Sequence, residues 1–260
     1  MPKQFCDISH WQGKINWDKY PFDTVIIKCS EGLTGVDSMY IDNQKAIRNK
    51  RLKCGYYHFA DGNDAKKEAQ HFLKNIELQE GEFLCLDYEI KLKDPVTWCK
   101  TFLDFVYDNT GVKPLIYMNY ATEKQFDWTN VKRHYQLWLA DYGINNGTIH
   151  TVPVLRNWTY PLIHQYTSKG VVDGIRGNVD MNVYDNLDGI GKVKQAQNLP
   201  PEPPTIPDPN NVPPTPENPT SEPVANIPVV QQPSEDDISS NITPKWWETI
   251  LSWLAIFLKK

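Results

Sequence analysis

The sequence predicts an α/β fold, a parallel β/α barrel of eight strands that is either complete or incomplete. Short apolar runs recur through about the first 194 of the 260 residues, each ending in polar or aromatic residues. Longer segments with a helical spacing of apolar residues separate the earlier runs. The second half is less regular, so an open doubly wound sheet remains the alternative arrangement.

The predicted strands are short and rich in β-branched and aromatic residues. In chain order they cover 4–9, 24–31, 53–59, 83–90, 114–120, 135–142, 161–167 and 178–184. Helices are predicted at 37–51, 64–76 and 95–110. The last of these has a clear start, because Asp94 suits an N-cap and Pro95 suits the first helical turn.

Composition changes sharply near Leu199. Of the 20 prolines, 14 lie between Pro200 and Pro244, a density that excludes helices and central strands. We therefore predict a barrel domain over residues 1–194, a proline-rich disordered linker over 195–242 and a short amphipathic helix over 243–260. The broad apolar face of that helix predicts membrane contact, with self-association or docking on the barrel as alternatives.

Composition and charge exclude several functions. The net charge is −5, and residues 1–194 carry equal numbers of acids and bases, so no basic surface indicates nucleic-acid binding. The five cysteines form no CxxC pair and no cluster with ligand-spaced histidines, so we expect reduced core thiols, no metal and no cofactor. The first residues, MPKQFCDIS, lack the apolar run of a signal peptide, which predicts synthesis in the cytoplasm.

Acidic and aromatic residues gather where the predicted strands end, and in a barrel the carboxyl ends of the strands form the active rim. In "LCLDYEI" (84–90), strand alternation would place Asp87 and Glu89 on one face. The alternative is that the strand ends at Leu86 and "DYE" begins a solvated loop. Some of these acids could instead be ordinary solvated groups, above all Glu31 and Asp141. The candidates are Asp7, Glu31, Tyr57, Asp87, Glu89, Asp141 and Asp180.

Seven collinear motifs resemble those of glycoside hydrolase family 25, the Chalaropsis-type lysozymes. They are "DISHWQGKINWDK" (7–19), "IIKCSEG" (26–32), "CGYYHFA" (54–60), "LCLDYE" (84–89), "PLIYMNY" (114–120), "LWLADY" (137–142) and "HQYTSKGVVDGIRGNVDMNVY" (164–184). The resemblance implies an irregular TIM-like barrel that cleaves the β-1,4 bond between N-acetylmuramic acid and N-acetylglucosamine in bacterial peptidoglycan. It also implies catalytic roles for Asp7, Asp87, Glu89 as general acid, and Asp180, with Tyr57 beside them.

The residues themselves suit this chemistry. Glycoside cleavage needs a protonated carboxyl and an ionised one, and repulsion between close acids keeps one protonated nearer neutral pH. Glu89 has the longer reach and is the natural donor, with Asp87 as its charged partner. Retention is favoured, by a carboxylate nucleophile or by the substrate's own N-acetyl oxygen, while inversion stays open. Predicted sugar contacts, each of which could instead belong to the core, are Trp11, Tyr57, Tyr117 and Trp138, with Glu31 as a polar contact.

The expected function is therefore that of a muramidase that degrades the bacterial cell wall, with a phage lysin released by a holin as the expected setting. A non-catalytic wall-binding protein is one alternative. A membrane-associated protein that acts through residues 243–260 is another.

Overall fold

The computed structural model describes residues 2–192. The predicted linker at 195–242 and the predicted helix at 243–260 lie outside the described residues, as do the last two residues of the predicted barrel domain. Within the described range, none of the helices has the length and apolar character that crossing a bilayer requires.

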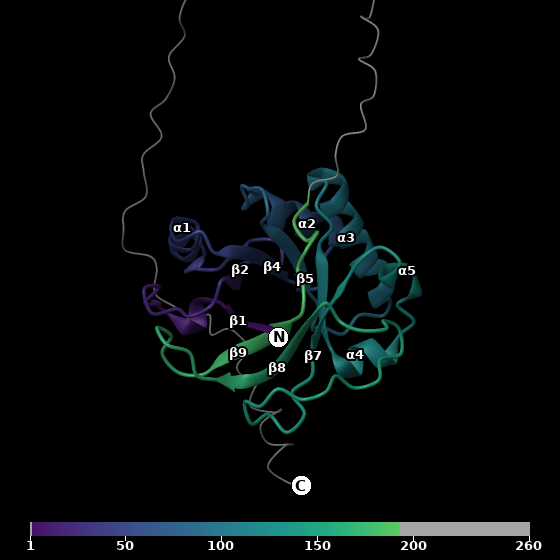
Figure 1. Cartoon of the computed structure of the whole chain (residues 1–260). Coiled ribbons are helices and arrows are strands. Elements are labelled where there is room, and N and C mark those ends of the chain that lie inside the picture. The colour runs from purple at the N-terminus through teal and green to yellow at the C-terminus, as the bar shows by residue number, and fades with distance from the viewer. Residues whose placement is uncertain (1, 193–260) are drawn as a thin grey trace, which may run out of the picture. The chain divides into compact units, whose positions relative to one another are not determined.

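Eight strands close into a barrel (Figure 1). Around the barrel they follow the order β1-β9-β8-β7-β6-β5-β4-β2, and β1 pairs with β2 to complete the ring, which excludes the open doubly wound sheet. A two-residue strand, β3 (Gly35–Val36), adds to the end of β2. The barrel strands are β1 (Lys3–Ile8), β2 (Thr24–Glu31), β4 (Lys53–Phe59), β5 (Phe83–Asp87), β6 (Leu115–Asn119), β7 (Leu137–Ala140), β8 (Ile163–Gly170) and β9 (Val179–Tyr184).

The prediction of an all-parallel barrel was wrong at one strand. β9 runs antiparallel to both of its neighbours, β8 and β1. Only residues 171–178 separate β8 from β9, and such a link is too short for the crossover that a parallel pair requires. The chain therefore turns back as a hairpin, and β9 crosses the barrel in the reverse direction.

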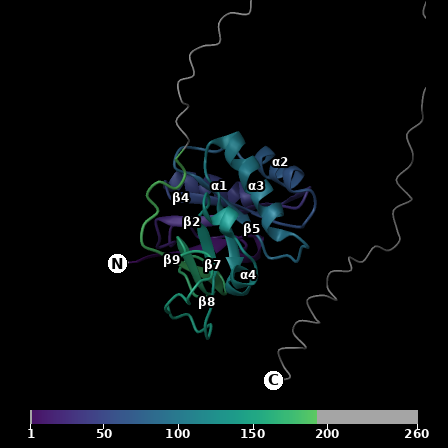
Figure 2. The same cartoon turned by 90° about the vertical axis from the view of Figure 1, so that its right-hand side faces the viewer.

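The helices lie outside the strands. α1 (Tyr40–Lys50) packs on β2 and β4, α2 (Ala65–Lys74) on β2, and α3 (Pro95–Thr110) on β5 and α2. Figures 1 and 2 both show these three helices on one side of the barrel, away from β8 and β9. The shorter helices are α4 (Tyr120–Gln125), which packs on β6, and α5 (Thr129–Lys132), which packs on α3; a 3-10 turn, η1 (His10–Gln12), follows β1.

Side-chain capping explains where two helices begin. Asp64 accepts a hydrogen bond from the Lys67 amide at the start of α2, and Asp94 accepts one from the Thr97 amide at the start of α3. Pro95 occupies the first turn of α3, where its missing N–H costs nothing. The third predicted helix is thus confirmed from its first residue to its last.

Two apolar layers hold the barrel. One fills its interior, with Phe5, Ile26, Phe83, Leu115 and Ile163 among its members, and the other lies between strands and helices. Gly55 on β4 makes room for the interior layer, because a Cβ there would lie 2.4 Å from the ring of Phe83. All five cysteines are free and buried, as the sequence predicted: Cys6, Cys29, Cys54, Cys85 and Cys99.

Candidate active site

Two acids face each other across the seam that β9 closes. Asp7 on β1 is the register partner of Asp180 on β9. Because β9 is antiparallel, its second residue lies at the same rim as the carboxyl end of β1. Asp7 is 7% exposed, whereas Asp180 is half-buried. The reversed strand therefore brings Asp180 to the rim that the sequence analysis assigned to it.

A hydrogen-bond network holds Asp7 from two sides. The Nε2 of Gln165 and the Nδ2 of Asn182 both donate to Asp7 Oδ1, at 2.9 and 2.7 Å. The indole Nε1 of Trp138 donates to Asn182 Oδ1 at 2.7 Å. An indole nitrogen can only donate, so this contact fixes the amide of Asn182 with its NH₂ group toward Asp7.

Two tyrosines fix the second amide in the same way. The hydroxyls of Tyr117 and Tyr142 donate to Gln165 Oε1 at 2.9 and 2.7 Å, which turns the Gln165 NH₂ group toward Asp7. Burial and the charge of Asp180 raise the pKa of Asp7 well above its ordinary value, while the donors on Asn182 and Gln165 act in the opposite direction. Both donors favour the ionised form, since a carboxylate accepts where a carboxylic acid would also have to donate.

Asp87 ends β5 in the barrel interior, with 8% of its surface exposed. Its Oδ1 is buried without a hydrogen-bond partner among the described residues. Burial raises the pKa of Asp87 well above its ordinary value; the charges of Glu89, Asp7 and Asp180 add to the rise, and Lys28 opposes it. A buried carboxyl oxygen without a partner is costly, and it is satisfied either by a proton or by a donor that a ligand brings.

Glu89 lies beyond the end of its strand. β5 stops at Asp87, so the prediction that both acids share a strand face by alternation was wrong. The chain instead leaves the sheet at Tyr88, whose amide bonds to the Tyr117 carbonyl and whose ring is buried, and this turn exposes Glu89 at the mouth of the barrel. Desolvation of its carboxyl raises the pKa of Glu89, whereas the Tyr117 hydroxyl and Lys28 lower it.

The four acids influence one another electrostatically. Burial first, and then the charge of Glu89, raise the pKa of Asp180 to about 6. The charges of Glu89, Asp7 and Asp180 in turn raise the pKa of Asp87. Four carboxyls that repel one another in this way cannot all ionise easily, so the cluster retains a proton at a higher pH than isolated acids would.

Lys28 is a charged residue beside the site that was not among the predicted site residues. It lies on β2, where its Nζ pairs with Glu31 at 2.6 Å and lies 4.8 Å from the centre of the Phe59 ring. Its positive charge lowers the pKa of both Asp87 and Glu89. The sequence feature that could have indicated this residue is a lysine within the apolar run "TVIIKCSE" (24–31). A charge is unusual in such a run unless it has a partner. Gln165 and Asn182 had no comparable signal.

The predicted sugar-contacting aromatic residues divide into two groups. Trp11 is 75% exposed and stacks beside His10, and Tyr57 is half-buried, so both offer surface to a ligand. Tyr117 and Trp138 are only 5% and 2% exposed, and their rings contact each other edge-on at 4.6 Å. Neither has a ring face free for a sugar, which favours the core alternative for both.

The two acids with the weakest sequence signal each have a partner outside the four-acid cluster. Glu31 is exposed and ion-paired with Lys28. Asp141 pairs with His150 at 3.1 Å. A direct part for Glu31 in the site stays a prediction, whereas the contacts of Asp141 direct it to a different group of residues.

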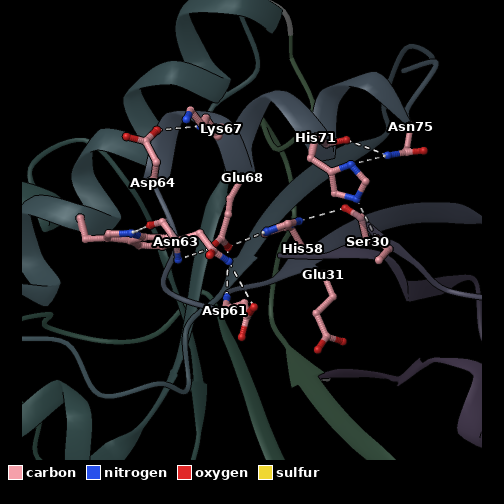
Figure 3. Close-up of polar contacts among 12 residues, drawn as sticks. Ser30, Glu31, His58, Asp61, Asn63, Asp64, Lys67, Glu68, His71 and Asn75 are labelled. Atoms are coloured by element: carbon pink, nitrogen blue, oxygen red, sulfur yellow. Dashed lines mark hydrogen bonds and ion pairs between the residues drawn. The ribbon is translucent and has the colours of Figure 1, made fainter. Parts of the chain in front are cut away.

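Behind the rim, a buried polar chain supports the loop that follows β4 (Figure 3). Ser30 contacts His58 Nδ1 at 2.9 Å, and His58 Nε2 contacts Glu68 at 3.1 Å. The Glu68 carboxylate also accepts from the amides of Asp61 and Asn63, at 3.1 and 2.6 Å. Burial alone would raise the pKa of Glu68, but these donors outweigh it and lower the pKa.

This chain of contacts has a consequence for the site. Burial lowers the pKa of His58, so a neutral ring donates to Glu68 and accepts from the Ser30 hydroxyl. Glu68 thereby holds residues 61–63, and the neighbouring Ala60 amide donates to the Asp87 carbonyl oxygen at 2.9 Å. The resemblance to a Ser–His–Glu triad is not functional, since Ser30 is fully buried. Its effect is to fix the loop beside Asp87.

Comparison with known proteins gives consistent matches. The family model described as "Glycosyl hydrolases family 25" matches residues 6–175. The autolytic lysozyme of Clostridium acetobutylicum is 28% identical over 186 residues, which are 68% of this chain and 54% of that protein. Lysozyme M1 of Streptomyces globisporus is 25% identical over 203 residues, covering 70% of this chain and 67% of that protein.

A solved structure agrees in fold and sequence. The catalytic domain of endolysin ply40, from bacteriophage P40 of Listeria monocytogenes, superposes with a TM-score of 0.61 at 31% identity. The match covers 72% of this chain and 94% of that domain. By contrast, this chain spans only about half the length of the clostridial autolytic lysozyme.

Proposed function

The chain belongs to glycosyl hydrolases family 25, and on that premise we propose that it is a muramidase acting on bacterial peptidoglycan. The bond it hydrolyses is the β-1,4 link between N-acetylmuramic acid and N-acetylglucosamine. The observation that carries the proposal is the convergence of four acids with raised pKa values, Asp7, Asp87, Glu89 and Asp180, at one rim. Such a cluster supplies both the proton donor and the charged carboxylate that glycoside cleavage needs.

Glu89 is the proton donor in this proposal. It stands exposed at the mouth of the barrel, where a glycosidic oxygen can approach its carboxyl. Desolvation raises its pKa, which favours the protonated form that a general acid must have. Asp87 lies deeper, at the carboxyl end of β5, and in this proposal its carboxyl faces the sugar ring that becomes cationic.

Substrate binding would help to assign the proton. In the free protein, burial favours a proton on Asp87. A donor on the substrate, such as its acetamido N–H, would bond to the accessible part of the Asp87 carboxyl and favour the ionised form. The resulting negative charge would raise the pKa of Glu89 and hold its proton for the leaving oxygen. This arrangement suits retention with the substrate's N-acetyl oxygen as nucleophile and Asp87 as its orienting group.

Asp7 and Asp180 complete the electrostatic environment. Asp7 is held in place by two amide donors whose orientation is fixed by Trp138, Tyr117 and Tyr142. These donors favour its ionised form against the burial that raises its pKa, so Asp7 would be a stationary negative charge when it ionises. Asp180, its neighbour across the seam, would add a second charge at a pH above its raised pKa of about 6. Fixed charges that need no reorganisation during the reaction stabilise a cationic transition state most effectively.

The test is hydrolysis of purified cell walls by the full chain. We expect new reducing ends that are N-acetylmuramic acid, identified as muramitol after borohydride reduction. Glu89→Gln should bind walls normally and lose at least about a hundredfold in rate, the scale of a lost general acid. The exposed Glu80 provides the matched control, and Glu80→Gln should keep the wild-type rate.

Three other outcomes of this experiment would change the proposal. Reducing ends of N-acetylglucosamine would replace the muramidase by a glucosaminidase. Wall binding without any new reducing ends would favour the non-catalytic wall-binding alternative. Near-normal hydrolysis by Glu89→Gln would remove Glu89 from the donor role.

We propose further that the chain acts as a phage lysin, reaching the cell wall after release by a holin or on lysis. The predicted helix at 243–260 would then bring the enzyme to a membrane or envelope. Liposome flotation of the full chain beside a 1–240 truncation tests this role. Equal partitioning of the two proteins would exclude membrane targeting, and loss of an oligomer on truncation would favour self-association.

A further inference from the structure

Three potential metal ligands meet on the outer side of the barrel. Asp141 directly follows β7, His164 lies on β8, and His150 lies in the loop between these strands. One ligand atom of each residue lies within 4.8 Å of the others. The sequence shows no ligand spacing for this group, because the three residues come from separate segments that only the folded barrel brings together.

The cluster is separate from the carboxyl site. Gln165 points into the barrel toward Asp7, and successive side chains on a strand point to opposite faces, so His164 points outward. The same alternation separates Asp141 from Ala140, which belongs to the interior apolar layer. The two sites therefore lie on opposite faces of the β7–β8 pair.

One pair of these ligand atoms has a spacing close to that around a bound ion. His150 Nε2 lies 3.1 Å from Asp141 Oδ2. Two ligands of a tetrahedral zinc ion, each about 2.0–2.1 Å from the metal, are about 3.3 Å apart. This pair of ligand atoms already has that separation, and the third ligand, His164, is largely buried beside them.

Backbone groups hold both rings in place. The His164 ring contacts the Asp141 carbonyl oxygen through Nε2 at 2.9 Å, and His150 Nδ1 lies 3.5 Å from the Thr148 carbonyl oxygen. Carbonyl oxygens that orient imidazole rings in this way commonly surround metal sites. Gly143 adds to this support, because it has a φ of +49° and a Cβ there would lie 3.2 Å from His150 Nε2. The loop can thus pack directly against the ring.

We propose that Asp141, His150 and His164 bind one divalent transition-metal ion of the zinc class. Two imidazoles and one carboxylate form a ligand set that suits Zn²⁺, with water in the remaining position. Such an ion would tie the loop that carries His150 to β8. The proposal goes beyond the hydrolase function and does not depend on it.

Calorimetric titration of the untagged full chain with Zn²⁺ tests the proposal. We expect one ion per chain, and at least a tenfold loss of affinity in His150→Ala. The exposed His134 provides the matched control, so His134→Ala should bind as the wild type does. Asp180→Asn should also bind normally, which separates this site from the carboxyl cluster. The residues after 192 contain neither histidine nor cysteine, and the five cysteines are buried, so competing soft ligands are few.

A second readout uses Co²⁺ in place of Zn²⁺. In the wild type we expect the strong visible absorption that Co²⁺ shows at a low coordination number. This absorption should be lost in His150→Ala and kept in His134→Ala. Absence of stoichiometric binding in the wild type would reduce the cluster to an ion pair and overturn the proposal. Binding that survives His150→Ala but is lost in Asp180→Asn would overturn it as well, and neither result would bear on muramidase activity.

Discussion

Replacing Asp180 by asparagine should increase stability while it lowers activity. Asp180 has an ordinary carboxyl pKa of 3.8, and burial together with the charge of Glu89 raises it to about 6 in the folded protein. A carboxyl whose pKa rises on folding binds its proton more tightly in the folded state. Its contribution to stability is therefore greatest below about pH 4, falls as the pH rises toward 6, and stays low above that.

The magnitude follows from the size of the shift. A rise of about two pKa units at about 1.4 kcal/mol per unit gives an upper limit of about 3 kcal/mol. Asp180 is half-buried and interacts with Glu89, so solvent screening reduces the expected effect to about 1–2 kcal/mol. Asparagine keeps the shape of the side chain and removes the charge, so Asp180→Asn should gain this amount at pH 7.5 and almost nothing at pH 4.

Urea unfolding of the full chain at both pH values measures the effect, and wall hydrolysis at pH 7.5 measures the loss of function. Asp173, exposed in the link between β8 and β9, provides the matched control, and Asp173→Asn should change stability little at either pH. A gain for Asp180→Asn that is the same at pH 4 and pH 7.5 would refute the electrostatic reasoning. So would a variant less stable than the wild type at pH 7.5.

Three further predictions concern the groups around the site. Trp138→Phe removes the donor to Asn182 Oδ1 and leaves a buried amide oxygen unpaired, so urea unfolding should show a loss of about 1–3 kcal/mol and wall hydrolysis should slow. An unchanged rate would mean that the orientation of Asn182 is unimportant. Glu68→Gln should cost about 1–3 kcal/mol because one amide oxygen replaces a carboxylate that accepts three bonds, and limited proteolysis should cut within 60–64 faster than in the wild type. The native protein should not react with a thiol reagent at pH 8, because burial raises the pKa of Cys6 and Cys29 to about 12, while the denatured chain should show five thiols.

The sequence by itself determined the strands and the identity of the acids. Apolar runs of the right length, separated by capped helical segments, predicted the eight barrel strands and the helix at 95–110, because both depend on local spacing and capping. The motifs around Asp7, Asp87, Glu89 and Asp180 singled out these residues as a group. The burial of the five cysteines also followed from their apolar surroundings.

Only the tertiary structure decided the direction of β9, the depth at which each acid lies and the side chains that each acid contacts. The reversal of β9, which places Asp180 opposite Asp7, depends on a link too short for a crossover, and sequence periodicity is the same for parallel and antiparallel strands. β5 ends at Asp87 and leaves Glu89 exposed beyond it, although the apolar pattern continues to Ile90. The amides that hold Asp7 and the His150–His164 contact join residues that are distant in sequence, and no local pattern encodes such encounters.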